Sequence, residues 1–307
     1  MLTPPPDLPP ETIAAAVGVD AAAIVYQPVG FGSHHWSVGQ EWFVTVDELD
    51  ARRLSVGETR ETAFDRLGAA LAAASSVGDS YAVPPAGPLV RLGAYAAIRY
   101  PFVAGESYGF ALYGPGEHRE AVLRLLIGVH TTTFDRLRRD DFTVPHRDAL
   151  EATLGGSVVG NAGPFEQRAA ALINDNAGPI RKLLDRYDAL AAVADPGRAV
   201  LTHGEPHTGN TLRTAAGWRL IDWETALIAP PERDLWLLGG DLSAYTDATG
   251  VAVRPELLEM YRLRWDIADL SIDVDRFRRP HTGNADDVEC LSILEKVVGS
   301  LGSPAAQ

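Results

Sequence analysis

The segment between residues 200 and 224 limits the folds open to this chain more than any other part of its sequence. It contains the polar loop His-Gly-Glu-Pro-His-Thr-Gly-Asn at 203–210 and then an apolar run that ends at Asp222. The two glycines and the proline of the loop make a helix unlikely there. We therefore expect a structured loop beside a strand end, with the side chains of Glu205, Asn210 and Asp222 close together.

The spacing of these side chains matches the kinase catalytic loop H-R-D-x-x-x-x-N, in which the acid and the metal-binding amide lie five positions apart. Glu205 and Asn210 have that spacing, and His203 precedes the acid by two residues. Mg²⁺ prefers oxygen ligands and often takes only one or two from protein, so Asn210 and Asp222 are sufficient to hold it. The pattern predicts a magnesium-dependent phosphoryl-transfer site in which Glu205 orients the attacking hydroxyl, with Glu224 available to a second ion.

The motif H-G-[D/E]-x-H-x-x-N, followed by a strand and I-D-W-E, resembles the aminoglycoside phosphotransferase family. Asp234, in Pro-Pro-Glu-Arg-Asp-Leu-Trp, adds to the resemblance, which is strong over residues 200–240. It implies an α+β, two-lobed protein-kinase-like fold with ATP and Mg²⁺ in the cleft. It also implies that Asp234 bonds back to the catalytic-loop backbone and that His203 fixes the loop. Most relatives have Asp where this chain has Glu205.

The order of the predicted elements agrees with this fold. An antiparallel N-lobe over residues 1–103 and a mainly helical C-lobe over 104–307 are expected, with a hinge around 99–106. Alternating, β-branched and aromatic segments predict strands, and apolar periodicity predicts helices. The N-lobe strands are expected at 23–28, 36–38, 41–46, 81–85 and 94–100, and the helices at 58–74, 117–132, 165–193 with a break near 178–179, 255–272 and 286–301.

A glycine-containing turn lies between the first two predicted strands. Gly30, Gly32 and Ser33 match the loop that covers the nucleotide in kinases, where bare glycines let backbone amides approach phosphates. A two-glycine turn also occurs in ordinary hairpins, so this interpretation depends on the downstream motif. Phe102 and Val103 would offer backbone groups and apolar side chains to the adenine ring.

The third strand departs from the kinase pattern. In kinases a lysine on this strand pairs with the nucleotide phosphates and with a glutamate of the next helix. Thr45 stands at that position, and the first lysine of the chain is Lys182. Glu58 or Glu61 would be the helix acid, but its expected partner is missing.

Three outcomes of the missing lysine remain open. One of the nearby arginines, Arg52, Arg53 or Arg60, substitutes for it, although a guanidinium differs in shape from an ammonium. Alternatively the metal, the hinge and the glycine loop hold the nucleotide without a cation. The third outcome is a degenerate, nucleotide-binding regulator with little or no transfer activity.

The acceptor is expected to be a small molecule with a hydroxyl group, such as an aminoglycoside-like antibiotic, which would make the protein an antibiotic-resistance enzyme. Trp265, Asp266 and Asp269 lie on one predicted helix, and the two acids are three residues apart on one face. Relatives that bind polyamino sugars use such acids, and an indole stacks on rings. An ordinary helix with solvated acids explains the same residues.

A zinc hydrolase is the third class of protein that the loop allows. His203, Glu205 and His207 are residue types that bind zinc. Two histidines four apart share a face only on a helix, which the loop composition disfavours.

Composition excludes several other functions. The net charge of −14 argues against binding to nucleic-acid backbones. No apolar run is long enough to span a bilayer, and the N-terminus lacks the pattern of a signal peptide. The lone Cys290 excludes an internal disulfide and fits a reducing compartment. We therefore expect a cytoplasmic protein; the sequence does not indicate its oligomeric state.

Overall fold

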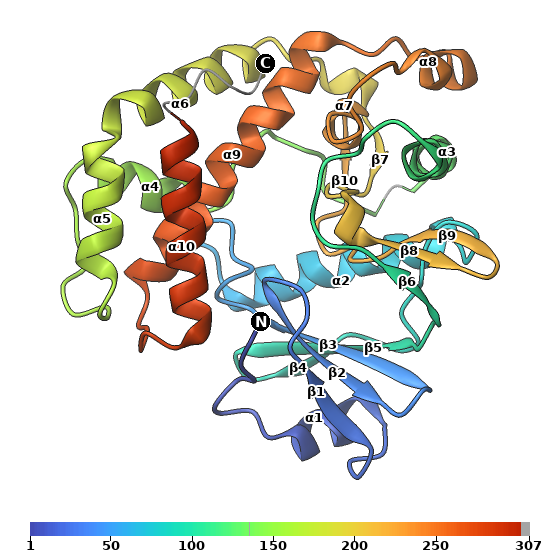
Figure 1. Ribbon diagram of the computed structural model, residues 1–307, viewed down its shortest axis with the longest axis horizontal. Coiled ribbons are helices and arrows are strands. Elements are labelled where there is room, and N and C mark those ends of the chain that lie inside the picture. The colour runs from blue at the N-terminus through green and yellow to red at the C-terminus, as the bar shows by residue number, and fades with distance from the viewer. Residues whose placement is uncertain (135, 302–307) are drawn as a thin grey trace.

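The computed structural model describes residues 1–134 and 136–301, apart from the side chain of Pro196. It shows a small lobe built on one antiparallel sheet and a larger, mainly helical lobe (Figure 1). The sheet of the small lobe has the order β1-β2-β3-β5-β4. Its elements are α1 (Pro10–Val17), β1 (Ile24–Gln27), β2 (Ser33–Val38), β3 (Trp42–Glu48), α2 (Arg60–Val77), β4 (Val90–Leu92) and β5 (Tyr95–Pro101).

The two faces of this sheet are covered by different helices. Val44 and Val46 of β3 are buried on one face, in a cluster with residues of α1. Because side chains alternate along a strand, Thr45 and Asp47 lie on the other face, which is the side of α2. This second face is directed toward the helical lobe (Figure 1).

The larger lobe contains eight α-helices and two small sheets among the described residues. The sheets pair β7 with β10, and β8 with both β6 and β9. The helices are α3 (Glu117–Thr131), α4 (Arg147–Leu154), α5 (Glu166–Asp175), α6 (Ala177–Ala191), α7 (Glu232–Leu235), α8 (Ser243–Thr249), α9 (Pro255–Arg278) and α10 (Ala285–Ser300), and the strands are β6 (Gly105–Ser107), β7 (Val200–Thr202), β8 (Thr211–Thr214), β9 (Gly217–Leu220) and β10 (Leu227–Ala229).

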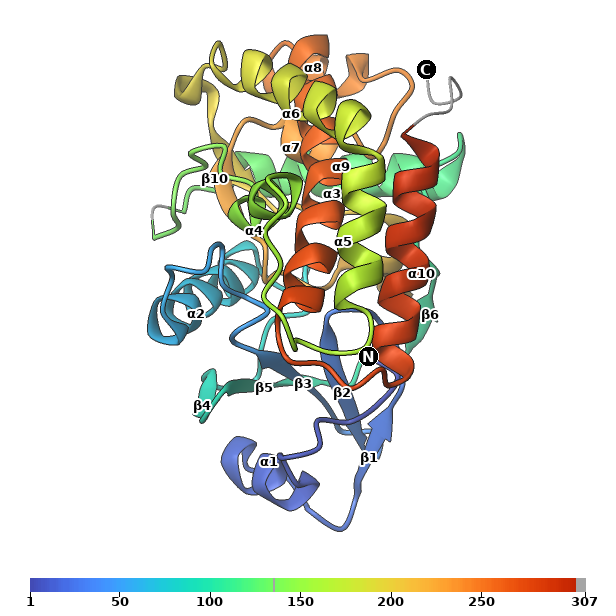
Figure 2. The same cartoon turned by 90° about the vertical axis from the view of Figure 1, so that its left-hand side faces the viewer.

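The long helix α9 organises this lobe. Figure 2 shows α5, α9 and α10 side by side, and α4 and α6 also pack against α9. Its apolar residues, such as Met260, Ile267 and Leu270, are fully buried in the largest core cluster. One polar end of α9 faces the small lobe, as described below.

In the part of the chain that the structure describes, no helix combines the length and the apolar character that crossing a membrane requires.

Three expectations for the elements were wrong. Residues 81–85 form no strand; Ala82 makes only an isolated parallel bridge to Leu220, and the edge strand is β4. The break between α5 and α6 lies at Asn176, before the predicted position, because Gly178 and Pro179 fit within the first turn of α6. Helix α9 also extends to Arg278, beyond residue 272, and α4, α7 and α8 were not predicted.

Candidate active site

One buried carboxylate, that of Asp234, binds the backbone at the start of the loop after β7. Asp234 accepts hydrogen bonds from the backbone N–H of His203 (2.8 Å) and of Gly204 (2.6 Å), and its Oδ2 lies 3.0 Å from Nε2 of His130. Burial raises the pKa of Asp234, but the His130 hydrogen bond and nearby positive charges outweigh burial, so the net shift is downward. The carboxylate therefore stays ionised and fixes the start of the loop.

Glycine is required at the second position of the loop. Gly204 has φ +105°, and a Cβ atom there would lie 2.4 Å from the guanidinium of Arg233. That guanidinium donates to Oγ1 of Thr202 at 2.9 Å and to the carbonyl of Thr225 at 2.7 Å. The loop can therefore turn over Arg233 only where no side chain intervenes.

His203 joins the loop to the end of β9. Its Nε2 donates to the carbonyl of Ile221 at 2.8 Å, and its Nδ1 accepts from the N–H of Glu205 at 3.3 Å. Burial lowers its pKa to about 4, so the ring is neutral at pH 7, and its edge contacts Trp223. Both nitrogens serve the backbone, which leaves none for zinc; among the described residues, no group of three or more His, Cys, Asp or Glu is arranged to hold a metal ion.

The amide of Asn210 orders the loop and leaves its oxygen free. Its Nδ2 donates to the backbone carbonyl of Glu205 at 3.0 Å. The backbone carbonyl of Asn210 accepts from the N–H of Ile221 at 3.0 Å. Only 7% of Asn210 is exposed. Within 1–134 and 136–301, Oδ1 of Asn210 accepts no hydrogen bond. This oxygen is therefore available to a cation.

Three acids and one arginine interact electrostatically at the end of β9. Burial raises the pKa of Glu205 to about 7 and that of Asp222 well above its usual range; Glu224 raises both further, and Arg52 lowers both. Asp222 has φ +62°, a left-handed conformation that is uncommon outside glycine. The structure thus brings Glu205, Asp222 and Asn210 together, and it places Arg52, one of the three candidate arginines, beside the acids.

The glycine loop lies between β1 and β2. Gly30 and Gly32 have φ of +70° and +88°, so both need the conformational freedom of glycine. Ser33 is buried, and its hydroxyl donates to Oδ1 of Asp47 at 2.8 Å.

The hinge residues lie beyond β5. The N–H of Phe102 donates to the carbonyl of Glu41 at 2.8 Å, so it is occupied; the ring is 40% exposed. The N–H of Val103 makes no hydrogen bond to any residue that the structure describes. Val103 is therefore the hinge residue whose amide is open to a base.

Residues of α9 lie beside the loop at 203–210, where Trp265 contacts His207. The ring of Trp265 stacks on Phe110 with a centroid distance of 5.8 Å and an angle of 16°. Asp266 is paired with Arg262 at 3.2 Å, whereas burial raises the pKa of Asp269 to about 7, with Glu205 as the next cause. Of the two predicted acids, Asp269 is the one whose pKa Glu205 raises.

Sequence reasoning missed Phe110 and Asp273, and it named His207 without its aromatic contacts. His207 packs edge-on against Phe110 and Trp265, and its buried Nδ1 has no partner among the described residues. Asp273, one turn beyond Asp269, is also buried. The spacing of Asp266, Asp269 and Asp273 along one helical face could have indicated the third acid, whereas nothing in the sequence around Phe110 indicates its position.

Known proteins resemble this chain in sequence and in fold. The model of the phosphotransferase enzyme family matches residues 12–271. Protein StrN of Streptomyces griseus is 34% identical over 157 residues, which are 48% of this chain and 47% of that protein. The chain thus matches about half the length of this relative.

Solved structures share the fold over nearly the whole chain. The spectinomycin phosphotransferase APH(9)-Ia, in complex with ADP and spectinomycin, has a TM-score of 0.68 at 18% identity and covers 95% of both chains. The GDP and kanamycin complex of APH(2″)-IIIa has a TM-score of 0.57 at 13% identity, with 94% of this chain and 97% of that chain covered. At these identities the likeness concerns the fold, and it confirms the two-lobed kinase-like arrangement expected from the sequence.

Proposed function

The chain belongs to the phosphotransferase enzyme family, and on that premise we propose that it transfers the γ-phosphoryl group of ATP to a hydroxyl of a small, amine-bearing molecule. The observation that carries this proposal is the convergence of Glu205, Asn210 and Asp222 at a loop braced by Asp234 and His203.

The donor atoms at this site fit Mg²⁺. Asp222 and the free Oδ1 of Asn210 are hard oxygen ligands, and water and phosphate would complete the shell. Packed acids such as Asp222 and Glu224 repel each other until a cation joins them, which is a second reason to assign a metal here. When bound, the cation offsets charge on the phosphate oxygens as the γ-phosphoryl group leaves.

Glu205 is the residue that we assign to the acceptor hydroxyl. It would orient the hydroxyl in line with the γ-phosphorus atom and accept its proton as the new O–P bond forms. His203 and Asp234 act through the backbone, since they fix the loop that carries Glu205. Catalysis then consists of positioning and charge compensation, without a covalent enzyme intermediate.

The acceptor side of the site favours a cationic ring compound. Asp269 faces Glu205, and the stacked rings of Phe110 and Trp265 offer an apolar surface beside it. A carboxylate next to an aromatic face suits an ammonium group on a saturated ring. An aminoglycoside-like antibiotic has this chemistry, and we favour this class of acceptor.

A direct assay tests the proposal. Purified protein is incubated with ATP, Mg²⁺ and a panel of hydroxyl compounds with and without amino groups, and phosphorylated product is detected by mass spectrometry. We expect transfer to amine-bearing members, reduced at least about 100-fold in Glu205→Gln and Asp222→Asn. Glu289→Gln, at an exposed acid of α10, is the matched control and should retain wild-type activity.

The second candidate is a nucleotide-binding regulator, favoured by the missing β3 lysine. Thermal-shift measurements with ATP, with and without Mg²⁺, separate the two candidates when combined with the assay. Magnesium-dependent stabilisation without product from any compound of a broad panel would support the regulator and contradict the enzyme.

A further inference from the structure

The loop between β3 and α2 carries an arginine that joins three parts of the cleft. Nε and Nη2 of Arg52 donate to Oδ1 of Asp47 at 2.9 and 2.6 Å. The same Nη2 lies 2.7 Å from Oγ of Ser33, which follows the glycine loop, and 3.3 Å from Oε1 of Glu224 in the other lobe. One guanidinium thus contacts the sheet, the residue beside the nucleotide-covering turn, and the segment that contains Asp222.

The position of this guanidinium corresponds to the missing strand lysine. Asp47 lies two residues beyond Thr45 and therefore on the same face of β3. Thr45 itself contacts Nδ1 of His35 at 3.3 Å and has no charge. On the neighbouring strand, burial raises the pKa of Tyr100, and Glu224 and Asp222 raise it further, so this face of the sheet is directed at the metal-binding acids.

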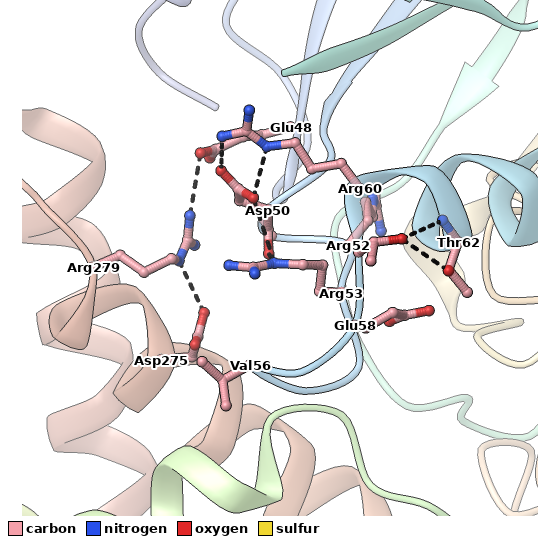
Figure 3. Close-up of polar contacts among 12 residues, drawn as sticks. Glu48, Asp50, Arg52, Arg53, Val56, Glu58, Arg60, Thr62, Asp275 and Arg279 are labelled. Carbon is pink, nitrogen blue, oxygen red and sulfur yellow. Dashed lines mark hydrogen bonds and ion pairs between the residues drawn. The ribbon is translucent and has the colours of Figure 1, made fainter. Parts of the chain in front are cut away.

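The other candidate arginines are engaged elsewhere. Figure 3 shows Arg53 and Arg60 directed at Asp50, with N–O distances of 3.4 and 2.5 Å. Neither contacts a residue that we assign to the site. Only Arg52, among the three, has the catalytic acid Glu205 as a cause of its own pKa shift; burial lowers that pKa, and Asp47, Glu224 and Glu205 raise it, with a net upward shift.

The helix acids that would pair with the strand lysine are also occupied. Glu58 pairs with Arg66 at 3.2 Å, and Glu61 pairs with Arg91. Arg66 in turn donates to the backbone carbonyl of Arg52. Glu58, just before α2, therefore stabilises the loop between β3 and α2 through Arg66. The ion-pair partner of Arg52 is Asp47 instead.

We propose that Arg52 supplies the phosphate-binding cation of this site and that Asp47 is the carboxylate that positions it. The inference rests on the proposed function, because it assumes a nucleotide in the cleft. Arg52 would donate to phosphate oxygens from Nη1 while Nε and Nη2 keep their bonds to Asp47, a fixed planar set of donors that a guanidinium offers and an ammonium does not. The cation thus enters from the loop after β3, and Asp47 replaces a helix glutamate.

The contacts leave Arg52 free to make these bonds. Within the described ranges its hydrogen bonds all come from Nε and Nη2, so Nη1 remains for a phosphate oxygen. The contact with Glu224 is the longest of the four, and the two hydrogens of Nη2 are already engaged by Asp47 and Ser33. About 20% of the Arg52 side chain is exposed.

Nucleotide binding tests this proposal without an acceptor. Calorimetry gives the dissociation constants of ADP with Mg²⁺ and of adenosine for the wild type, Arg52→Ala, Arg52→Lys and Arg53→Ala. Arg53 is the matched control, since it lies in the same loop and its side chain is 22% exposed. We expect Arg52→Ala to weaken ADP binding about 10- to 100-fold and adenosine binding less than about twofold. Arg52→Lys should recover only part of the loss, and Arg53→Ala should behave as the wild type.

The design also covers a folding defect. Removal of Arg52 leaves Asp47 buried without its cation, so the double variant Asp47→Asn/Arg52→Gln is measured beside the single one, with thermal unfolding as the check. A selective loss of ADP affinity in a folded variant supports the proposal. Wild-type ADP affinity in either folded variant overturns it.

Failure of the two proposals can be told apart. If the wild type binds ADP through Arg52 but phosphorylates no compound of the panel, the proposed activity is wrong and the role of Arg52 stands. If transfer occurs and Arg52→Ala binds ADP as tightly as the wild type, the opposite holds. A wild type that binds neither ATP nor ADP contradicts both.

Discussion

Gly204 shows how one residue without a side chain determines the shape of the catalytic loop. Its φ of +105° is strained for any L-residue, and its Cα faces the guanidinium of Arg233. The same peptide unit donates to Asp234, so the turn, the arginine and the carboxylate form one arrangement. A change at residue 204 therefore acts on Glu205 through the backbone.

We expect Gly204→Ala to lower the free energy of unfolding by about 2 kcal/mol or more, because a Cβ clashes with buried Arg233 and the backbone is strained. Urea unfolding followed by circular dichroism measures the change. The control is Gly299→Ala in the last turn of α10, where a Cβ meets no atom of a described residue within 4 Å and helix propensity gains up to about 1 kcal/mol. Equal stability of the two variants would contradict this account of the loop.

At the level of elements, α9 combines a buried apolar face with buried acids. Asp273 is 4% exposed, and burial raises its pKa to about 8, with Asp269 adding to the rise and Arg276 opposing it. In the unfolded chain the pKa is near 3.9. Folding therefore becomes less favourable as pH rises and this carboxyl ionises, so its contribution is lost between about pH 4 and pH 8.

Asp273→Asn removes this dependence. We expect the variant to be more stable than the wild type at pH 8 by about 1–3 kcal/mol, and the difference to shrink at pH 5. Denaturant unfolding at both values measures it, with Glu289→Gln of α10 as an exposed control. A difference that stays the same at pH 5 and pH 8 would show that ionisation of Asp273 has no part in the effect.

Elements with strong local signals could be predicted from the sequence, and those defined by tertiary contacts could not. The strands β1 to β3 and the long helices follow apolar periodicity. The segment at 81–85 has the composition of a strand. Its only β-bridge among the described residues joins Ala82 to Leu220, so it forms no strand. The acid-rich end of α9 looked like a helix end because its polar residues, including Asp273 and Asp275, are buried by other segments.

The residues of the candidate site also differ in whether the sequence alone could predict them. The proximity of Glu205, Asn210 and Asp222 could be predicted from their spacing, since the loop and the following hairpin are contiguous in sequence. The contacts of Arg52 with Ser33 and Glu224 join segments 19 and 172 residues apart, so no spacing rule reveals them. Charge alone also leaves ion pairs undetermined, since Asp266 is paired with Arg262 of its own helix.

At the level of the whole molecule, the loop between β3 and α2 also contacts the helical lobe. Figure 3 shows Arg279, at the end of α9, between Asp275 and Glu48, with distances of 2.9 and 3.2 Å. Nearby, the N–H of Val56 donates to Asp148 at 2.9 Å. These contacts link the end of β3 and the following loop to α9 and α4.

We expect Arg279→Ala to lower the free energy of unfolding by about 0.5–1 kcal/mol at low salt and by less at 1 M salt, because partly exposed ion pairs are weak and screened. Arg168→Ala, at a more exposed pair with Glu295, is the control and should change stability by less. Chemical denaturation at two ionic strengths gives both values. A loss that is independent of salt would assign the effect of Arg279 to packing rather than to charge.

The main-chain bond between His146 and Leu54 has a consequence for how the proposed nucleotide would leave. At 2.7 Å, the N–H of His146 in the helical lobe donates to the carbonyl of Leu54, two residues past Arg52. If the sheet moves outward about the hinge, this hydrogen bond holds the loop between β3 and α2, and with it Arg52, against the helical lobe. We expect the base to dissociate first and the diphosphate to dissociate last. The dissociation rate constant of ADP should then depend on the strength of this hydrogen bond more than on the contacts of the base.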